Sequence, residues 1–527
     1  MNLERAGQVL QLLYQFGVDE VVCCAGARNA PFIKWLSQTD RFQSRFHFEE
    51  RSAGFYALGR IQKLRKPVAV FTTSGTAVAE LLPAVVEAHY QGLPLIVVSS
   101  DRPKEFRGTG SPQTIEQNNI FQIYAKRSWD LTSASVELDL AFAPSNGPLH
   151  INICFSEPLL TGEIGSLEWT RHSRNTLSAS PVRREEIENL RQFFHQVSRP
   201  MAIVNSVPQP FRERLIEELC RLRIPTYLEG AAGLSGESRM EPYILKGEED
   251  DLRKWASQNE IDGVLRFGGV PTLRFWRDLE TKWRDLPVLS VSQMPFTGLS
   301  RIKDPALSFH AYFECRQSLG DGWERNWWPS GLVMPSLETV EQWQELSQRF
   351  PKSEWSGVFE LQKRILPDEV VFVGNSLPIR HWDFVSSLNY KKLPSVYVNR
   401  GTNGIDGLIS SMFGVADENR RTWGLIGDLS ALYDLSALSL KQWFPEGDVK
   451  LVVINNGGGK IFSRLFSDPA FENRHTLRFK GVAEMFNWKY SLIEDFSQWQ
   501  DSKGCELIEW IPSEVETHDF MSCWSKK

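Results

Sequence analysis

The feature that most constrains the fold is a repeat between the two ends of the chain. The matched segments, which come in the same order at both ends, are 20–32 with 369–382, 68–81 with 423–435, and 93–103 with 449–459. Each reads as a short strand that ends in a small or polar turn, as in EVVCCAGARNAPF and EVVFVGNSLPIRHW. Such strands, alternating with helical patterns, are typical of a parallel sheet wound by crossover helices. The repeat therefore predicts two related α/β domains, although unrelated α/β domains share this outline too.

A third α/β block lies between the two repeated ones. Its candidate strands are 201–204, 225–228, 263–267 and 287–291. The polar, turn-rich segment 160–182 predicts a linker before this block, and a stretch with Trp and Pro at 322–336 leads out of it. A chain of 527 residues is also too long for one hydrophobic core. We predict an α/β protein of three doubly wound parallel-sheet domains, which span 1–165, 183–335 and 350–527.

The composition excludes several classes of protein. A net charge of −6 gives no bulk reason to expect nucleic acid or an anionic membrane as a partner. Seven scattered cysteines without a C-x-x-C pair suit a reducing compartment and argue against disulfides or zinc. The first residues predict an amphipathic helix closed by Gly17 rather than a signal peptide. Because no apolar run approaches the ~20 residues that span a bilayer, we expect a soluble cytoplasmic protein.

Polar groups follow two predicted strands near the C-terminus. Asp428 follows GLIG, and Asn455 and Asn456 follow LVVI. Ligands of open α/β sheets bind beyond the carboxyl ends of the strands. A carboxylate, an amide oxygen and a backbone carbonyl from the following glycines form an oxygen set that suits Mg²⁺. Leu429 and Ser430 open the next helix, where backbone N–H groups favour a diphosphate. Taken singly, an Asp after a strand is more often a helix cap, and Asn-Gly is more often a turn.

Together these residues resemble a known motif. GD at 427–428 with NN at 455–456 is similar to the thiamin diphosphate motif of the thiamin-dependent 2-oxo-acid enzymes, whose usual third glycine is Leu429 here. GDLSALYDLSAL and INNGGGKIF resemble one branch, the 2-succinyl-5-enolpyruvyl-6-hydroxy-3-cyclohexene-1-carboxylate synthase family of menaquinone biosynthesis. The other segments that carry the resemblance are 48–59, 71–88, 147–159, 372–383 and 396–408. It covers both outer domains well and the middle domain poorly.

The resemblance implies a cofactor site and an assembly. A pyrimidine-binding N-terminal domain and a diphosphate-binding C-terminal domain would hold thiamin diphosphate between two subunits of a homodimer or homotetramer. Asp428, Asn456 and the carbonyl of Gly458 would bind Mg²⁺ or Mn²⁺. The residues that the resemblance places at the cofactor are Glu50, Ser376, Ile405, Asp428, Leu429, Ser430, Asn456, Ile461 and Phe462. Ile405 would bend the cofactor, and Ile461 with Phe462 would form an apolar wall, although all three also suit an ordinary core.

Glu50, in FHFEERSAG, is the strongest catalytic candidate. By resemblance it bonds to the aminopyrimidine ring of the cofactor, which requires a carboxylic acid whose pKa is raised by burial. On position alone it equally suits an acid in the first turn of a helix. Adjacent Glu49 is a rival, but the E-R pairing in EERS favours Glu50. Gln113 and Ser376 match polar residues of the family site and complete the catalytic set.

Four arginines fall at or just beyond the ends of predicted strands, namely Arg28, Arg102, Arg380 and Arg400. The planar arginine fork pairs with carboxylates, although a single arginine is more often a surface ion-pair partner. By resemblance the four, with Gln113, bind 2-oxoglutarate and isochorismate. Arg274 replaces a lysine that the family places near the substrate. Ala27 and Pro112 stand where the family has Ser and Asn, so two hydrogen-bonding side chains are lost.

The resemblance also implies the reaction. The chain would decarboxylate 2-oxoglutarate and add the succinyl unit to isochorismate. The closest alternative is another thiamin diphosphate enzyme, an acetolactate-synthase-like protein or a simple 2-oxo-acid decarboxylase, which would not need so many arginines. A nucleotide-binding regulatory or scaffold protein is a third possibility, because a fold does not fix a function.

Overall fold

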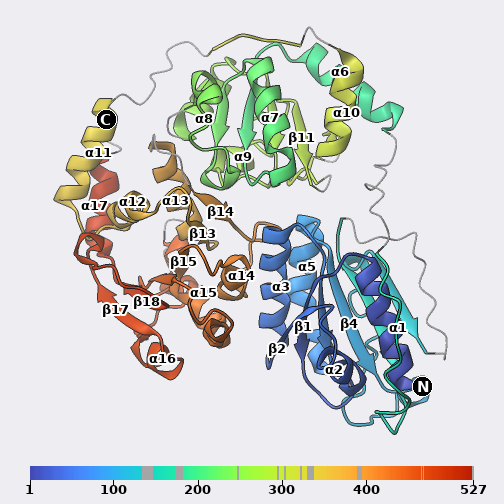
Figure 1. Cartoon of the computed structure of the whole chain (residues 1–527). Helices are drawn as coiled ribbons and strands as arrows, with labels where there is room; N and C mark the ends of the chain where they lie inside the picture. Colours follow the sequence, from blue (N-terminus) through green and yellow to red (C-terminus); the bar gives the residue numbers. More distant parts are fainter. Residues whose placement is uncertain are drawn as a thin grey trace. The chain divides into compact units, whose positions relative to one another are not determined.

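The computed structural model describes most of the chain and shows three six-stranded parallel sheets (Figure 1). The described residues are 1–132, 146–171, 182–245, 249–293, 296–301, 304–320, 323–328, 337–388, 394–463, 466 and 468–524. They divide into two compact units. The first comprises Met1–Ser178, Asp406–Val415 and Tyr433–Leu440, and the second comprises Ala179–Ile405, Ala416–Leu432 and Lys441–Lys527. The first sheet lies in the first unit, and the other two sheets lie in the second.

The first sheet has the strand order β2-β1-β3-β4-β6-β5, with every pair parallel. Its strands are β1 (Glu20–Cys24), β2 (Gln43–His47), β3 (Val68–Thr72), β4 (Leu95–Asp101), β5 (Arg127–Leu131) and β6 (Leu149–Cys154). Its helices are α1 (Asn2–Gln15), α2 (Ala30–Leu36), α3 (Glu50–Leu64), α4 (Thr76–Ala79) and α5 (Leu82–Gln91), with short 3-10 turns η1 (Lys104–Phe106) and η2 (Gln122–Tyr124).

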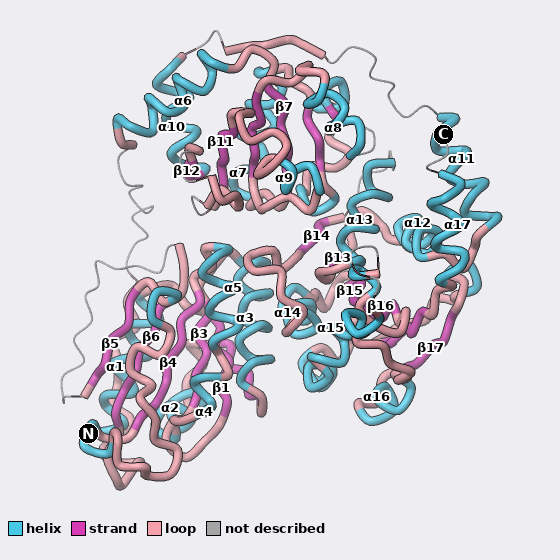
Figure 2. The backbone as a smooth tube through the Cα atoms, turned by 180° about the vertical axis from the view of Figure 1, so that it is seen from behind, coloured by secondary structure: helices cyan, strands magenta, loops and turns pink. Residues whose placement is uncertain are grey.

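Helices cover both faces of this sheet. Side chains of α1 and α2 pack with Val21, Cys23 and Phe71 on one face, while α3 and α5 lie on the other (Figure 1; Figure 2 shows the same layers from behind). Because both faces are buried, the inner strands β1 and β3 are almost continuously apolar. The predicted N-terminal helix is confirmed: α1 ends at Gln15, and Gly17 follows with φ 82°.

The second sheet has the order β12-β11-β10-β7-β8-β9, in which the chain starts at the middle and winds outward twice. Its strands are β7 (Pro200–Val204), β8 (Thr226–Leu228), β9 (Ile244–Leu245), β10 (Gly263–Phe267), β11 (Val288–Ser292) and β12 (Ala306–Ser308). Its helices are α6 (Arg184–Gln196), α7 (Gln209–Leu222), α8 (Glu249–Ser257), α9 (Arg274–Asp278) and α10 (Phe309–Leu319), with 3-10 turns η3 (Gly230–Ala232) and η4 (Ser238–Tyr243). The four strands predicted in this block are confirmed.

The third sheet has the order β14-β13-β15-β16-β18-β17. Its strands are β13 (Val370–Val373), β14 (Ser395–Tyr397), β15 (Thr422–Gly427), β16 (Val449–Ile454), β17 (Lys489–Ile493) and β18 (Glu506–Trp510). The last third of the chain also contributes α11 (Leu337–Arg349), α12 (Glu354–Arg364), α13 (Leu377–Leu388), α14 (Leu408–Val415), α15 (Asp428–Tyr433), α16 (Lys480–Met485), α17 (Glu514–Trp524), η5 (Leu435–Trp443), η6 (Lys460–Phe462), η7 (Pro469–Glu472) and η8 (Phe496–Gln498). Of these, α14 belongs to the first unit, where it packs on α3.

The predicted repeat is confirmed by the topology. Numbered from their own first strands, the first and third sheets share the order 2-1-3-4-6-5. The three matched sequence pairs fall on β1 and β13, β3 and β15, and β4 and β16. In both sheets the winding direction reverses between the first and third strands, which is where open α/β sheets bind ligands. The predicted fold class of three parallel α/β sheets is therefore correct.

The first predicted linker differs from the structure, and parts of both connecting segments lie outside the described residues. Residues 160–171 form neither helix nor strand, but Ile164, Leu167 and Trp169 pack against the core of the first sheet. The prediction that the linker starts at 160 is thus wrong, because these apolar side chains hold the segment to the first unit. Residues 172–181 lie outside the described residues, as do 321–322 and 329–336 of the Trp- and Pro-containing stretch. No helix in the described part of the chain is long and apolar enough to cross a membrane.

Candidate active site

Glu49 and Glu50 have different tasks at the start of α3. The Glu49 side chain caps the helix by accepting hydrogen bonds from the backbone N–H groups of Arg51 and Ser52, at 3.1 and 3.0 Å. It also accepts a 3.0 Å bond from the Ser436 hydroxyl. Glu49 is therefore engaged in holding the local backbone, and Glu50 is the acid that remains for chemistry.

Glu50 is the first residue of α3, so the sequence-based alternative of an acid in the first helical turn is also correct. Its Oε1 accepts a long 3.4 Å hydrogen bond from the Thr72 hydroxyl at the end of β3. Burial raises the pKa of Glu50, and the nearby charge of Glu49 raises it further. The pKa is thus shifted in the direction that proton sharing near neutral pH requires.

Arg28, Arg102 and Gln113 gather at the carboxyl edge of the first sheet. The Arg28 guanidinium is buried and donates to the Phe155 carbonyl and to Glu157, both at 3.1 Å. Burial lowers the pKa of Arg28, and the charge of Arg102 lowers it further, so the two arginines are near neighbours. Arg102 in turn donates from Nε to the Pro112 carbonyl at 3.1 Å.

Gln113 comes directly after Pro112, in a left-handed backbone conformation with φ 54°. Pro112 replaces an asparagine of the family and has no side-chain amide, but its backbone carbonyl still accepts a hydrogen bond from Arg102.

Ser376, Arg380 and Arg400 form a second cluster at the carboxyl edge of the third sheet. Ser376 has φ 74°, and its carbonyl accepts a 2.7 Å bond from Arg380. Arg400 is buried and donates to the Asn375 side chain at 3.2 Å. Burial lowers the pKa of Arg380, and the charge of Arg400 adds to this. Two neighbouring cations on this edge provide binding capacity for anions.

Asp428 connects the ends of β15 and β16. It is the first residue of α15, so Leu429 and Ser430 lie in the first turn of that helix, as predicted. The Asp428 Oδ2 accepts hydrogen bonds from the backbone N–H groups of Gly457 and Gly458, both at 2.9 Å. The His475 Nε2 lies 3.3 Å from the same oxygen. Burial raises the pKa of Asp428, and these N–H groups act against that rise. The turn LVVINNGGG therefore closes directly on the carboxylate.

Asn456 presents an oxygen that needs a ligand. Its Nδ2 donates to Glu354 at 2.8 Å, which fixes the orientation of the amide. Its Oδ1 is buried and accepts no hydrogen bond from the residues that the structure describes. Asn455 differs, because its amide donates to Glu509 and to the Leu477 carbonyl in the core.

A buried amide oxygen without a donor is costly unless something binds there. The described residues include no group of three or more His, Cys, Asp or Glu side chains that could hold a metal. Any ion at this turn would therefore use a mixed set of oxygens.

Comparison with known proteins identifies the family. The family model described as thiamine pyrophosphate enzyme, N-terminal TPP binding domain, matches residues 4–120. A 2-succinyl-5-enolpyruvyl-6-hydroxy-3-cyclohexene-1-carboxylate synthase from Bdellovibrio bacteriovorus is 38% identical over 522 residues, with 98% of each chain covered. The synthase of the same name from Akkermansia muciniphila is 35% identical over 540 residues, covering 96% of this chain and 95% of that protein.

The chain belongs to this synthase family. The resemblance deduced from the sequence is confirmed, and thiamin diphosphate is the cofactor that the matched domain binds. A solved structure, benzoylformate decarboxylase from Polynucleobacter necessarius, matches with a TM-score of 0.72 and 17% identity over 97% of this chain and 98% of that one. That identity is low, so this match shows the shared fold alone.

Sequence reasoning missed a pair of buried acids beside the second arginine cluster. The Thr272 hydroxyl lies within hydrogen-bond distance of both Glu229 and Asp383, at 2.7 and 2.8 Å. Burial raises the pKa of both acids, and the charge of Asp383 raises that of Glu229 further, whereas Arg400 acts to lower both. Glu229 directly follows β8, which is the signal that could have found it, whereas Asp383 lies within α13 and no local pattern marks it.

The remaining residues that the resemblance places at the cofactor lie in turns and at the start of a helix. Ile405 is half-buried in the turn before α14, and Leu429 and Ser430 lie in the first turn of α15. Ile461 and Phe462 form part of η6, where Phe462 is 39% exposed, so the alternative of a buried core position is wrong for Phe462.

Arg274 lies at the start of α9 and pairs with Asp278 one helical turn away, at 3.0 Å. Its side chain is 63% exposed. The structure thus shows Arg274 in a surface ion pair, and a role in substrate binding stays a prediction.

Proposed function

We propose that this protein decarboxylates 2-oxoglutarate and adds the resulting succinyl unit to isochorismate, giving 2-succinyl-5-enolpyruvyl-6-hydroxy-3-cyclohexene-1-carboxylate and CO2 in menaquinone biosynthesis. It is a thiamin diphosphate-dependent transferase. The observation that carries the proposal is the relationship to the synthase family along 98% of the chain. The four arginines, Arg28, Arg102, Arg380 and Arg400, support it, because the two substrates carry four carboxylates between them.

When bound, thiamin diphosphate supplies a thiazolium carbon that adds to the keto carbon and accepts the electrons left by CO2. Glu50 would hold a proton on its carboxyl oxygen and share it with a ring nitrogen of the aminopyrimidine. Its burial and long hydrogen bond to Thr72 fit this task. Gln113, at the carboxyl edge of the first sheet, and Ser376, at that of the third, would position reacting groups.

The residues at the LVVINNGGG turn fit a divalent cation. Asp428 supplies a carboxylate, Asn456 an otherwise unbonded buried oxygen and Gly458 a backbone carbonyl. Such an oxygen set suits Mg²⁺ or Mn²⁺, which would neutralise a diphosphate. The backbone N–H groups of Leu429 and Ser430 would contact that diphosphate. Ile405 would shape the bound cofactor.

Other residues would bind and enclose the substrates. The arginines and Gln113 would fix carboxylates, with Arg274 as a weaker outer contact. Ile461 and the partly exposed Phe462 would exclude water and favour loss of charge on decarboxylation.

The assembly and its compartment complete the proposal. We assign pyrimidine binding to 1–165 and diphosphate binding to 350–527, with a central domain at 183–335. The cofactor would bind between subunits of a homodimer or homotetramer. All seven cysteines are free, which supports a cytoplasmic location.

A coupled assay tests the function. Purified protein with 2-oxoglutarate, thiamin diphosphate and Mg²⁺ should consume isochorismate, followed by its absorbance, and omission of 2-oxoglutarate should stop the loss. Release of CO2 from 2-oxoglutarate without loss of isochorismate would favour the alternative of a simple decarboxylase. Folded protein that consumes neither substrate would refute both.

A further inference from the structure

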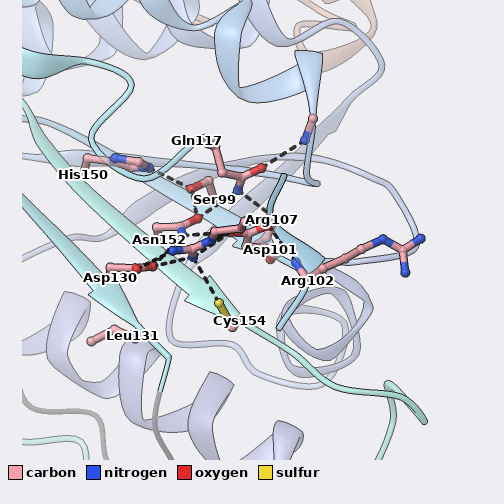
Figure 3. Close-up of polar contacts among 12 residues, drawn as sticks. Ser99, Asp101, Arg102, Arg107, Gln117, Asp130, Leu131, His150, Asn152 and Cys154 are labelled. Carbon is pink, nitrogen blue, oxygen red and sulfur yellow. Dashed lines mark hydrogen bonds and ion pairs between the residues drawn. The ribbon is translucent and has the colours of Figure 1, made fainter. Parts of the chain in front are cut away.

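A buried polar cluster lies behind the first arginine site, between β4, β6 and β5 (Figure 3). At its centre the Arg107 guanidinium lies between two acids. It donates to Asp101 at 2.8 and 3.2 Å and to Asp130 at 2.7 and 2.8 Å. The Asn152 amide also bonds both acids, at 3.2 and 2.8 Å. Side chains from distant parts of the sequence thus share one set of contacts.

The side chains of the cluster are largely buried. Asp101 and Asn152 are fully buried, and the Arg107 side chain is 14% exposed. Burial alone would raise the pKa of Asp130, but hydrogen bonds from Arg107 and Asn152 lower it overall. All three guanidinium nitrogens of Arg107 donate hydrogen bonds to these two acids, so Arg107 cannot form a bidentate pair with a substrate carboxylate.

The cluster is connected to the site through the backbone. Asp101 accepts a 2.7 Å bond from the backbone N–H of Arg102, which fixes the chain as it leaves β4. Figure 3 shows the Arg102 side chain extending away from the cluster. Arg102 bonds the Pro112 carbonyl, next to Gln113. The segment that carries both candidate substrate residues is therefore tied to the cluster where it leaves the strand.

A second connection runs through Gln117. Its Nε2 donates to Asn152 at 2.8 Å, and its Oε1 accepts the backbone N–H of Gly75 at 3.0 Å. Gly75 has φ 86°, and a Cβ there would lie 3.2 Å from the Gln113 Cα. The turn after β3 and the Gln113 backbone are thus packed together and held by the same cluster.

We propose that Arg107, Asp130 and Asn152 are positioning residues that hold Arg102 and Gln113 in place for the substrate carboxylates. The inference deepens the proposed function and rests on it. The segment 102–117 contains only one short 3-10 turn, so it has little regular structure to fix it. Buried ion clusters seldom add more stability than apolar side chains of similar size. A cluster of this kind is better explained by the precise placement of the segment that it anchors.

Asp130→Asn is the first test, because it keeps the shape of the side chain and removes its charge. We expect the KM for the substrate that depends on Arg102 to rise by roughly 10- to 100-fold, because a small misplacement of a binding group has an effect of this size. Thiamin diphosphate affinity, followed by tryptophan fluorescence, should stay within about twofold. Hydrogen exchange of residues 102–117 should become faster.

The control is Glu218→Gln, which breaks the buried ion pair with Arg316 in the second sheet. It should lower thermal stability to a similar extent and leave both KM values and exchange of 102–117 unchanged. Equal kinetic effects in the two variants would mean general destabilisation and would overturn the inference.

A double-mutant cycle with Arg102→Ala separates the effect of the cluster from that of Arg102 itself. If the cluster acts through Arg102, Asp130→Asn should add less than about twofold to the KM of the Arg102→Ala variant. A KM rise in Arg102→Ala with none in Asp130→Asn would refute positioning but not the proposed function. Unchanged KM values in Arg102→Ala itself would refute the assigned substrate role.

Gln117→Met is the second variant, for use if Asp130→Asn does not fold. It has no charge to lose and removes only the amide that joins Asn152 to Gly75. We expect the same KM to rise, by a smaller factor. Unaltered KM and exchange in this variant would contradict the inference.

Discussion

The first and third sheets share one strand order, yet two carboxylates at the ends of non-equivalent middle strands, β4 and β15, have different partners. In the first sheet, Asp101 at the end of β4 is bound by the Arg107 guanidinium. In the third, Asp428 at the end of β15 is bound by backbone N–H groups and lies beside His475. The first carboxylate is paired with an arginine of the same sheet edge, whereas the second has no lysine or arginine partner among the described residues. The comparison teaches that the identity of the donor, rather than the fold, decides whether such a site anchors a loop or binds an ion.

The largest effect is expected at Glu50, a half-buried acid at the start of α3 that no arginine or lysine pairs with in the described structure. Glu50→Gln should lower kcat by about 10²- to 10⁴-fold, because the amide cannot share a proton with the cofactor. Thiamin diphosphate should still bind, as fluorescence titration can measure. Glu446→Gln, an exposed position, serves as the control. Near-normal turnover in Glu50→Gln would make Glu49 the catalytic candidate instead.

The matched pair Asp428→Asn and Asp101→Asn tests the comparison directly. Asp428→Asn should weaken Mg²⁺-dependent binding of thiamin diphosphate by more than about 100-fold, because loss of the proposed direct metal ligand should exceed the loss of a residue one step removed from a metal. Asp101→Asn should leave that binding unchanged and raise a substrate KM. Titrations at several Mg²⁺ concentrations measure both. If both variants lost Mg²⁺-dependent binding of thiamin diphosphate to the same extent, the proposed difference between Asp101 and Asp428 would be wrong.

A smaller effect on stability is expected at Asp434, which accepts bonds from the backbone and hydroxyl of Ser410. Burial raises its pKa from 3.8 to about 7. A raised pKa means that its contribution to stability is present below the unfolded value of 3.8 and is lost as pH rises through 7. As the pH rises from about 5 to about 8, the free energy of unfolding of Asp434→Asn should therefore increase by about 2 to 3 kcal/mol relative to that of the parent protein. Thermal unfolding of both proteins at the two pH values measures this, and parallel pH curves would contradict it.

The smallest effect is expected at Arg274. Its side chain is largely exposed, and ion pairs of this kind are worth at most about 1 kcal/mol, so Arg274→Ala should raise a substrate KM by no more than about fivefold. Steady-state kinetics with each substrate varied in turn provide the measurement. A much larger increase would place Arg274 in the site as firmly as the arginines of the sheet edges.

Much of the fold could be predicted because its signals are local. Strands buried on both faces are apolar along most of their length, so β7, β10 and β16 could be found from their residues alone. The linker was placed too early because Leu167 and Trp169 sit in an otherwise polar stretch, and nothing in the local pattern shows what they pack against.

The sequence by itself determined the repeat, the three α/β blocks, the family and the pairing of Asp428 with the LVVINNGGG turn. Only the tertiary structure decided that Glu49 caps a helix while Glu50 is spared, that Arg107 lies between two acids, and that Glu229 meets Asp383. Periodicity and turn chemistry act over a few neighbouring residues. Contacts such as that of Arg107 with Asp130 depend on which strands become neighbours, and that order exists only once the chain has folded.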